Sequence, residues 1–194
     1  MSNTLKRFCC LLMMAVSPVI AAQGEDSRPN IVFIMSDDHA VRAVSAYGNS
    51  LMATPNIDRI ASRGMRFDRA YVGNAICGPS RATMMTGLHS HGNGFYSNEW
   101  SGPFDGEQQT LSTLLQASGY ATAVVGKWHL YSDPVGFDYW DVINNAMEQG
   151  TYYNPHFRSP AGVEEATGYV AELVTDKAID WLAQARDSLS LIHI

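Results

Sequence analysis

Apolar and polar positions along the chain form strand-like runs that alternate with helical patterns. The continuous apolar run at residues 31–35 is typical of a parallel strand buried on both faces, and we expect it to lie centrally in a sheet. Further strands are predicted at about residues 65–72 and at 121–125. The stretch from residue 131 to about 164 is rich in Tyr, Asn and Pro and is predicted to be loop.

Four helices are also predicted, three before the strand at residues 121–125 and one after it. Thr54 is a favoured N-cap, and Pro55 suits the first helical position. Residues 170–185 place apolar side chains at the spacing of one helix face. The expected limits are residues 55–64, 79–87, 110–119 and 170–185. Strands alternating with helices predict an α/β fold with a mostly parallel central sheet, in which ligands bind beyond the carboxyl ends of the strands.

The N-terminus has the three parts of a secretory signal peptide. Lys6 and Arg7 precede an apolar stretch at residues 8–20, and the small residues Ala21 and Ala22 follow. We therefore expect a signal peptide at residues 1–22, a linker at residues 23–28, and export to the periplasm or the exterior. No later segment reaches the length of a membrane span, so no span is expected after cleavage.

Composition narrows the classes of function. The 194 residues are 46% hydrophobic and carry a formal net charge of -6. Such a chain can bury a core, which argues against disorder. It has no basic run, so nucleic acid is not an expected partner. Two of the three cysteines lie in the predicted signal peptide, which leaves Cys77 alone and no internal disulfide.

Adjacent carboxylates follow the first predicted strand. Asp37 and Asp38 would repel each other unless a positive charge lay between them. Oxygen ligands favour a hard cation such as calcium or magnesium over zinc. The alternative is that one of the two carboxylates caps a helix or closes a turn.

Cationic side chains lie near the starts and ends of other predicted elements. Cys77 precedes a helix start, where free N–H groups favour an anion, and Arg81 follows one turn later. Lys127 and His129 follow the strand at residues 121–125. The pattern predicts a site for sulfate or phosphate, with Cys77 either a nucleophile or a small buried residue.

Four segments of the chain resemble motifs of one known family. The sequence CGPSRATMMTG at residues 77–87 resembles the sulfatase signature C-x-P-S-R-x-x-L-x-T-G, with Met84 at the Leu position. The sequence GYATAVVGKWH at residues 119–129 resembles the second signature, G-Y-x-T-x-x-x-G-K-x-H. Residues 29–38 and 54–58 resemble the opening of the same family, and the four matches occur in the family's order.

The resemblance implies an alkaline-phosphatase-like α/β sandwich and a hydrolase of sulfate esters. It implies that a formylglycine-generating or sulfatase-maturating enzyme converts Cys77 to formylglycine (3-oxoalanine), whose hydrate supplies the nucleophile. By position in the motifs, Asp37 and Asp38 would bind calcium together with the modified Cys77. The residues that would orient the hydrate and neutralise the sulfate are Arg81, Lys127 and His129.

Substrate preference is predicted from weaker resemblances. His91 follows the signature helix and precedes a glycine, where the family has a histidine that could bind substrate. Residues 37–40 and 150–155 resemble the branch that acts on sulfated glycans, such as N-acetylglucosamine 6-sulfate. A phosphonate or phosphodiester hydrolase of the same superfamily and a non-catalytic anion- or glycan-binding fragment are the alternatives.

The family's later motifs have no match in the chain. Sulfatases of this class contribute a second, Asp-Asn pair of calcium ligands and a further His and Lys from well beyond these segments. We therefore expect residues 29–188 to be a truncated, N-terminal portion of the catalytic domain, with little or no activity alone. Residues 189–194 do not fit the family's continuation and are expected to be a tail outside the native reading frame.

Overall fold

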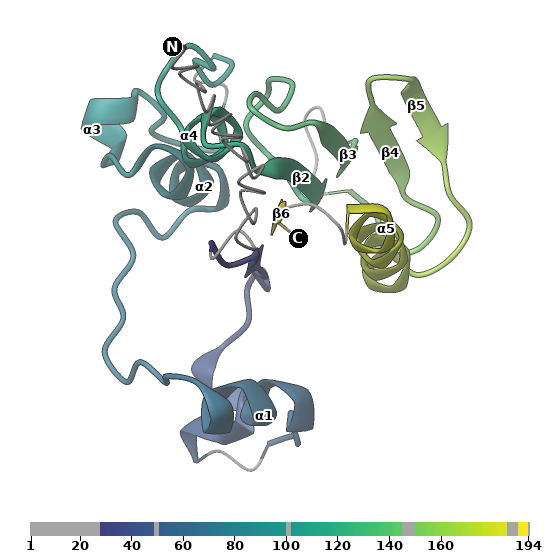
Figure 1. Ribbon diagram of the computed structural model, residues 1–194. Helices are drawn as coiled ribbons and strands as arrows, with labels where there is room; N and C mark the ends of the chain where they lie inside the picture. The colour runs from purple at the N-terminus through teal and green to yellow at the C-terminus, as the bar shows by residue number, and fades with distance from the viewer. Residues whose placement is uncertain (1–27, 49–50, 100–101, 145–149, 186–189, 194) are drawn as a thin grey trace, which may run out of the picture.

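The computed structural model describes residues 28–48, 51–99, 102–144, 150–185 and 190–193 (Figure 1). The predicted signal peptide and nearly all of the predicted linker lie outside these residues. No helix among the described residues has the length and apolar character needed to cross a lipid bilayer. The strands are β1 (Ile31–Phe33), β2 (Ala121–Gly126), β3 (Tyr139–Ile143), β4 (His156–Ser159), β5 (Gly162–Glu165) and β6 (Ser190–His193). The α-helices are α1 (Pro55–Arg63), α2 (Cys77–Thr86), α3 (Ser90–Asn93), α4 (Leu111–Ala117) and α5 (Val170–Ala185).

The six strands form one mixed sheet in the order β1-β6-β2-β3-β4-β5. The neighbours from β1 through β6 and β2 to β3 run parallel. β4 and β5 continue the sheet as an antiparallel hairpin. The prediction of an α/β fold with a mostly parallel sheet is therefore confirmed.

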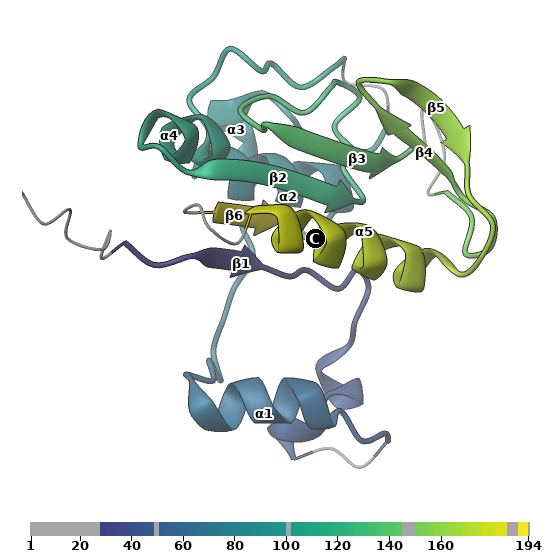
Figure 2. The same ribbon diagram turned by 45° about the vertical axis from the view of Figure 1, so that its right-hand side comes forward.

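Helices cover both faces of the sheet, because successive side chains of β2 point to opposite sides. Val124 packs on one face in a buried cluster with Met85 of α2. Val125 packs on the other face with Ala178 and Trp181 of α5. Figures 1 and 2 show α2, α3 and α4 on one side of the sheet and α5 on the other. The buried cores thus fix α2 and β2 against each other, which positions the residues at their ends.

The helix predictions are confirmed, with differences at the N-termini. Thr110 accepts a hydrogen bond from Thr113 N and forms a capping box at α4. At α1, by contrast, the Thr54 side chain caps no backbone N–H; its hydroxyl donates to Asp58 at 3.0 Å. α2 begins at Cys77, two residues before the predicted start. Cys77 therefore occupies the first turn itself, where the helix has free backbone N–H groups.

Two predictions of secondary structure are wrong. Residues 65–72 form no strand, and the side chains of Met65, Phe67 and Tyr71 are exposed. The region 131–164 is not simply a loop, because it contains β3, β4 and β5. Its strands alternate with turns at Asn, Gly and Pro, and those turn residues obscured the short apolar pattern between them.

β1 is a parallel strand, as predicted, but it is an edge strand of the described sheet and not a central one. Its side chains are accordingly not buried on both faces: Val32 is 52% exposed, and Ile34, just beyond the strand, is 65% exposed. Tyr120 holds the start of the strand by donating its hydroxyl to Pro29 O at 3.0 Å. The apolar run is typical of a buried strand, but the described residues do not cover its side chains.

α1 and two short 3-10 helices, Val41–Ala43 and Ser45–Tyr47, form a unit set apart from the sheet (Figures 1 and 2). Ser45 and Thr54 both donate to the Asp58 carboxylate, at 2.6 and 3.0 Å, which ties the unit together. The apolar face of α1 is open, because Ile57 and Ile60 are both exposed.

β6 contributes a strand between β1 and β2, with Leu191 paired in register with Ile31. These residues fall within the segment predicted to be a tail outside the native reading frame. Position in the sheet does not report on a reading frame, so that expectation remains a prediction.

Asp138 links the amino ends of β2 and β3, so replacing it tests how much this link stabilises the sheet. It accepts hydrogen bonds from Thr122 N at 2.8 Å, from the Thr122 hydroxyl at 3.1 Å and from Gln116 at 2.6 Å. Because the carboxylate is exposed, we expect Asp138→Ala to lower the free energy of unfolding by only about 1 kcal/mol, as measured by urea denaturation beside the parent chain.

The same contacts make the loss of stability in Asp138→Ala depend on pH. Burial raises the pKa of Asp138, but its hydrogen bonds to Thr122 and Gln116 outweigh that effect and hold the pKa below its usual 3.8. The stabilisation is therefore present above the unfolded-state pKa and is lost as pH falls through the folded-state pKa. The difference between variant and parent should shrink below about pH 4; a difference that grows on acidification would contradict this role.

Candidate active site

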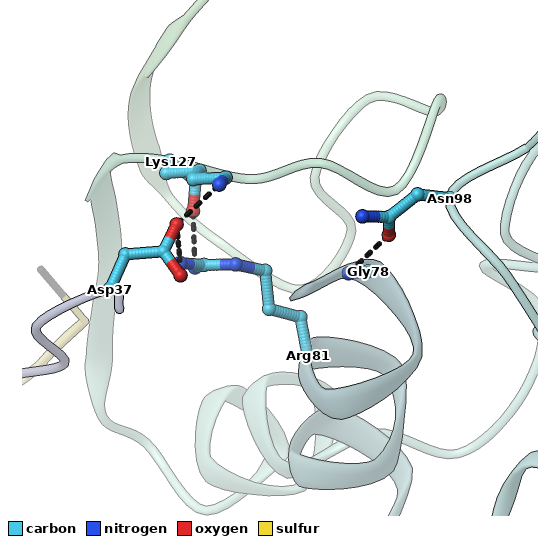
Figure 3. Close-up of polar contacts among 5 residues, drawn as sticks. All are labelled: Asp37, Gly78, Arg81, Asn98 and Lys127. Carbon is cyan, nitrogen blue, oxygen red and sulfur yellow. Dashed lines mark hydrogen bonds and ion pairs between the residues drawn. The ribbon is translucent and has the colours of Figure 1, made fainter. Parts of the chain in front are cut away.

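A carboxylate and two cations meet where β1, β2 and α2 approach one another. Asp37 follows β1, Lys127 follows β2, and Arg81 lies in the second turn of α2 (Figure 3). The Lys127 ammonium donates to the Asp37 carboxylate, and Arg81 Nη2 lies 4.0 Å from Asp37 Oδ2. Arg81 Nη1 donates to the Lys127 backbone oxygen at 2.5 Å. The carboxyl ends of the parallel strands thus bring together three residues that the sequence singled out.

Arg81 is the buried cation of this group, with only 4% of its side chain exposed. Burial lowers the pKa of Arg81, which the charges of Asp37 and Cys77 partly offset, yet a guanidinium stays protonated at physiological pH. Its Nε is buried and has no hydrogen-bond partner among the described residues. A buried donor without a partner costs free energy, so the guanidinium has capacity left for an anion.

Asp37 is held ionised by its neighbours. Burial raises the pKa of Asp37, but the hydrogen bond and charge of Lys127, aided by the charges of Arg81 and His129, hold it below its usual value. An ionised carboxylate beside two cations leaves the group with net positive charge. The group therefore favours a bound anion while offering oxygen ligands to a metal ion.

The N-terminus of α2 lies beside this charged group. Cys77 is its first residue, half-buried and with a free thiol. The next residue, Gly78, donates its backbone N–H to Asn98 Oδ1 at 2.9 Å (Figure 3). The helix dipole adds partial positive charge at this end of the ten-residue helix. Helix, Arg81 and Lys127 thus all favour negative charge near Cys77.

Gly78 is required by close packing. A Cβ at this position would lie 2.7 Å from Phe95 Cε1, 3.0 Å from Asn98 Oδ1 and 3.0 Å from His129 O. Phe95 is buried and cannot easily move. For the sulfate ester hydrolysis that the resemblance implies, we therefore expect Gly78→Ala to displace the first turn of α2 and to lower kcat about 10- to 100-fold in an active protein that contains these residues.

Gly92→Ala is the matched control for that variant. Gly92 also lies in a helix, but a Cβ there would be no closer than 3.4 Å to any neighbour, which is ordinary contact. We expect this control to keep the parental rate. Equal rates for Gly78→Ala and the parent would show that the packing at Gly78 does not position the site.

His129 lies against the same helix end and is 6% exposed. Burial, with the charges of Lys127 and Arg81, lowers the pKa of His129, although Asp37 opposes the shift. Its backbone takes the left-handed conformation, with φ 58°. Its Nδ1 is buried and has no partner among the described residues. The imidazole is therefore neutral at physiological pH and has a ring nitrogen free to accept or donate one hydrogen bond.

A cavity of about 380 Å³ opens beside these residues. Its lining includes the charged residues Asp37, Asp38, Arg81 and Lys127 together with Tyr152 and Thr175, but neither Cys77 nor His129. Asp38 adopts the left-handed conformation, with φ 50°. The structure thus brings Asp38 to the same cavity as Asp37, and the combination of charged and aromatic walls suits a small polar ligand.

His91 is not part of this group. It lies in α3, where its ring stacks on that of His89 with centroids 5.9 Å apart. It lines a different pocket, with Phe104 and Gln108. A role for His91 in binding substrate stays a prediction.

The sequence reasoning missed Asn98 and Tyr131. Asn98 contacts Gly78, and the Tyr131 hydroxyl donates to the Asn98 backbone oxygen. Neither residue belongs to a spacing with a chemical signature. Only the fold brings the loop that carries Asn98 to the start of α2.

The donor set fits part of a calcium site. Asp37 and Asp38 supply the hard oxygen atoms that calcium prefers, and they line one cavity. Calcium takes six to eight oxygen ligands, and the described residues contain no group of three or more His, Cys, Asp or Glu side chains arranged to hold a metal. The two carboxylates would therefore form one side of such a site.

Comparisons with known proteins agree with this geometry. The Sulfatase family model matches residues 29–194. The N-acetylglucosamine-6-O-sulfatase of Bacteroides thetaiotaomicron is 51% identical over 158 residues, which is 81% of this chain and 28% of that protein. Human N-acetylgalactosamine-6-sulfatase is 36% identical over 138 residues, which is 62% of this chain and 26% of that protein.

A solved structure shows the same fold. It contains a protein in complex with its substrate, D-glucosamine-2-N,6-O-disulfate, and superposes with a TM-score of 0.82 at 47% identity. The match covers 86% of this chain and 33% of that protein. The chain therefore spans about a third or less of the length of each of these three proteins. The family match over nearly all of the described residues, together with the cationic group at α2, shows that the chain belongs to the sulfatase family.

Proposed function

We propose that the chain is the N-terminal catalytic portion of an exported, calcium-dependent sulfatase that hydrolyses sulfate esters on glycans. The observation that carries the proposal is the buried Arg81, which meets Asp37 and Lys127 beside the helix end that begins with Cys77. This arrangement supports the proposal because its positive charge, and an Arg81 Nε that has no partner among the described residues, lie near residue 77, where the sulfate group would bind.

The chemistry proposed at residue 77 is the one that the resemblance of residues 77–87 to the sulfatase signature implies. A separate maturation enzyme would oxidise Cys77 to formylglycine, and a hydroxyl of its hydrate would attack sulfur while the S–O bond to the sugar breaks and the alcohol leaves. Asp37, Asp38 and the modified residue 77 would hold calcium, which would polarise the sulfate. Arg81 and Lys127 neutralise the sulfate oxygens as negative charge shifts onto them during the reaction. The ring nitrogen Nδ1 of His129, which has no partner among the described residues, can exchange a proton with the hydroxyl or with the leaving oxygen.

The substrate is proposed to be a glycan sulfated on an amino sugar, such as N-acetylglucosamine 6-sulfate. Support comes from the relative that is 51% identical and from the disulfated glucosamine bound in the similar structure. Tyr152, which is exposed and lines the cavity, offers an aromatic face on which a sugar ring could stack.

The proposal is tested with a fused chain, in which residues 29–185 are joined to the part of the B. thetaiotaomicron relative that follows the matched segment. The fused chain is produced with a sulfatase-maturating enzyme and assayed on N-acetylglucosamine 6-sulfate and on the matching phosphate ester, with calcium and with a chelator. We expect turnover of the sulfate ester, its loss on chelation, and a mass at residue 77 that corresponds to formylglycine.

The 194-residue chain assayed alone is the control, and we expect little or no turnover from it. A fused chain that folds but prefers the phosphate ester would favour the phosphodiester or phosphonate hydrolase alternative. A fused chain that binds sulfated sugar without any turnover, although formylglycine is present, would favour a binding role. Cell fractionation with an antibody to the chain tests export to the periplasm or the exterior.

A further inference from the structure

We infer that Lys177 is a positioning residue for the glycan: its ammonium joins α5 to β3 and β5 and thereby holds the first turns of α5 as a wall of the substrate cavity. The inference rests on the proposed function, because the glycan is the ligand that this wall would contact. It concerns a residue on the face of the sheet opposite to α2. Three features support it: the contacts of Lys177, the place of α5 beside the cavity, and the segment bound to the start of α5.

Lys177 connects α5 to three strands of the sheet. Its Nζ donates to Asp141 Oδ2 of β3 at 2.5 Å and to Glu164 Oε1 of β5 at 3.1 Å. The same ammonium lies 4.7 Å from the ring centroid of Phe157 in β4, and Phe157 is fully buried. Figure 1 shows α5 beside the β4–β5 hairpin that supplies two of these partners. One side chain thus fixes the helix against this end of the sheet.

Asp141 makes the contact hard to replace. Its side chain is 9% exposed, and its Oδ1 is buried without a hydrogen-bond partner among the described residues. Burial raises the pKa of Asp141 above its usual value, and the hydrogen bond and charge of Lys177 offset only part of that effect. A buried carboxylate costs free energy unless it is paired. The pair therefore resists separation, and α5 is held in one place.

The turns of α5 that precede Lys177 line the cavity. Val170 and Val174 lie seven and three residues before Lys177, so the three side chains share one helix face. Both valines line the cavity together with Lys127. α5 also approaches the end of β2 closely, because a Cβ at Gly126 would lie 3.2 Å from Val174 Cγ1. A shift of α5 would therefore change the shape of the cavity next to Lys127.

The start of α5 is also bound to the segment that contains Tyr152. Val170 N donates to Tyr152 O at 2.8 Å, and Asn154 N donates to Gly168 O at 2.9 Å. Gly168 N in turn donates to Asn154 Oδ1 at 3.0 Å. These bonds join α5 and the segment into one wall, and the residues of this wall that line the cavity carry no charge. We therefore expect the wall to contact the sugar ring and not the sulfate.

The test uses the fused chain with Cys77→Ala, which binds ligands without turnover, and calorimetric titration with N-acetylglucosamine 6-sulfate and with sodium sulfate. Lys177→Met keeps the length of the side chain but loses its charge, and it should weaken binding of the sulfated sugar about tenfold. Sulfate affinity should stay within about twofold of the parent, because Arg81 and the start of α2 are unchanged. In the fused chain with formylglycine, KM should rise about tenfold while kcat changes less than about threefold.

Two further variants separate position from stability. Lys177→Arg keeps a charged donor for both carboxylates, so its affinity for the sulfated sugar should stay within about threefold of the parent. The double variant Asp141→Asn with Lys177→Met leaves no buried charge unpaired, so its thermal midpoint should return toward that of the parent. Its affinity for the sulfated sugar should remain about tenfold weaker, because the link to α5 is still absent.

Arg158→Met is the matched control. Arg158 pairs with Asp133 and lies 5.4 Å from the ring centroid of Trp140, so it also combines an ion pair with an aromatic contact. Trp140 packs against the buried cluster on the α2 face of the sheet, and neither Arg158 nor Trp140 lines the cavity. This variant should bind the sulfated sugar as the parent does.

Three outcomes would overturn the inference and leave the proposed function standing. The first is parental affinity for the sulfated sugar in Lys177→Met. The second is recovery of that affinity in the double variant along with its thermal midpoint, since the effect would then come from stability alone. The third is an equal loss of affinity for sulfate and for the sulfated sugar. By contrast, a fused chain that carries formylglycine and binds the sulfated sugar without turnover would overturn the proposed function alone, and a parent that binds neither ligand would overturn both.

Discussion

Replacement of Cys77 by alanine is expected to reduce turnover of sulfate esters by the fused chain by about 10⁴-fold or more. In the proposed reaction the hydrate formed at position 77 carries the nucleophilic hydroxyl, and none of the surrounding groups can replace it, because Arg81 and Lys127 are hydrogen-bond donors and Asp37 is paired with Lys127. Alanine is a good helix former and fits the first position of α2, so the loss should not reflect unfolding.

Two measurements accompany the assay of Cys77→Ala. The thermal midpoint should lie close to that of the parent, and sulfate affinity should fall less than threefold, because Arg81 and the helix end remain. Turnover within tenfold of the parent would contradict a covalent role for residue 77 and would point to direct attack by water.

Arg81→Lys is expected to lower kcat/KM for sulfate esters by about 100- to 1,000-fold in the fused chain, even though the charge is kept. The guanidinium uses two of its nitrogens at once, since Nη1 donates to Lys127 O at 2.5 Å while Nη2 faces Asp37 at 4.0 Å. A lysine ammonium has no planar fork and cannot hold both partners and a sulfate oxygen in one geometry. The kinetic constants of variant and parent measure this effect.

Arg66→Lys is the matched control. Arg66 also uses two nitrogens, for Asp68 at 2.8 Å and for the Ala46 backbone oxygen at 2.7 Å, but its side chain is exposed. Exposed ion pairs contribute little stability, so we expect parental kinetics and nearly parental stability. If the kinetic constants of Arg81→Lys were as close to the parent's as those of Arg66→Lys, the planar guanidinium of Arg81 would have no part in the reaction.

The sequence predicted which residues meet at the site better than it predicted the structure around them. Asp37, Arg81 and Lys127 lie in separate segments, and the rule that ligands bind beyond the carboxyl ends of parallel strands was enough to expect that they meet. The contact of Lys127 with Asp37 confirms that expectation. The backbone of α2 was also predictable, because Pro79 and Gly87 suit a first turn and a helix end.

Other features could not be predicted because they depend on packing. The hydrogen bond from Gly78 to Asn98 joins a helix to a loop that no local pattern links. β3 pairs with β2 through a register set by the fold, as Ala123 opposes Tyr139. Periodicity predicts that an apolar run will be buried, but it does not say by what, and so β1 was expected at the centre of the sheet.

The pairing of β1 with β6 has a consequence for how the chain acquires its structure. The two strands come from opposite ends of the described chain, with Ile31 opposite Leu191 and Phe33 opposite His193. A growing polypeptide cannot form this pair until nearly all of these residues have been synthesised. Contacts so distant in sequence make folding slow, because the long loop between them must close first. During that interval the apolar residues of β1 remain without their neighbour, so this pairing is among the last steps in the folding of the described residues.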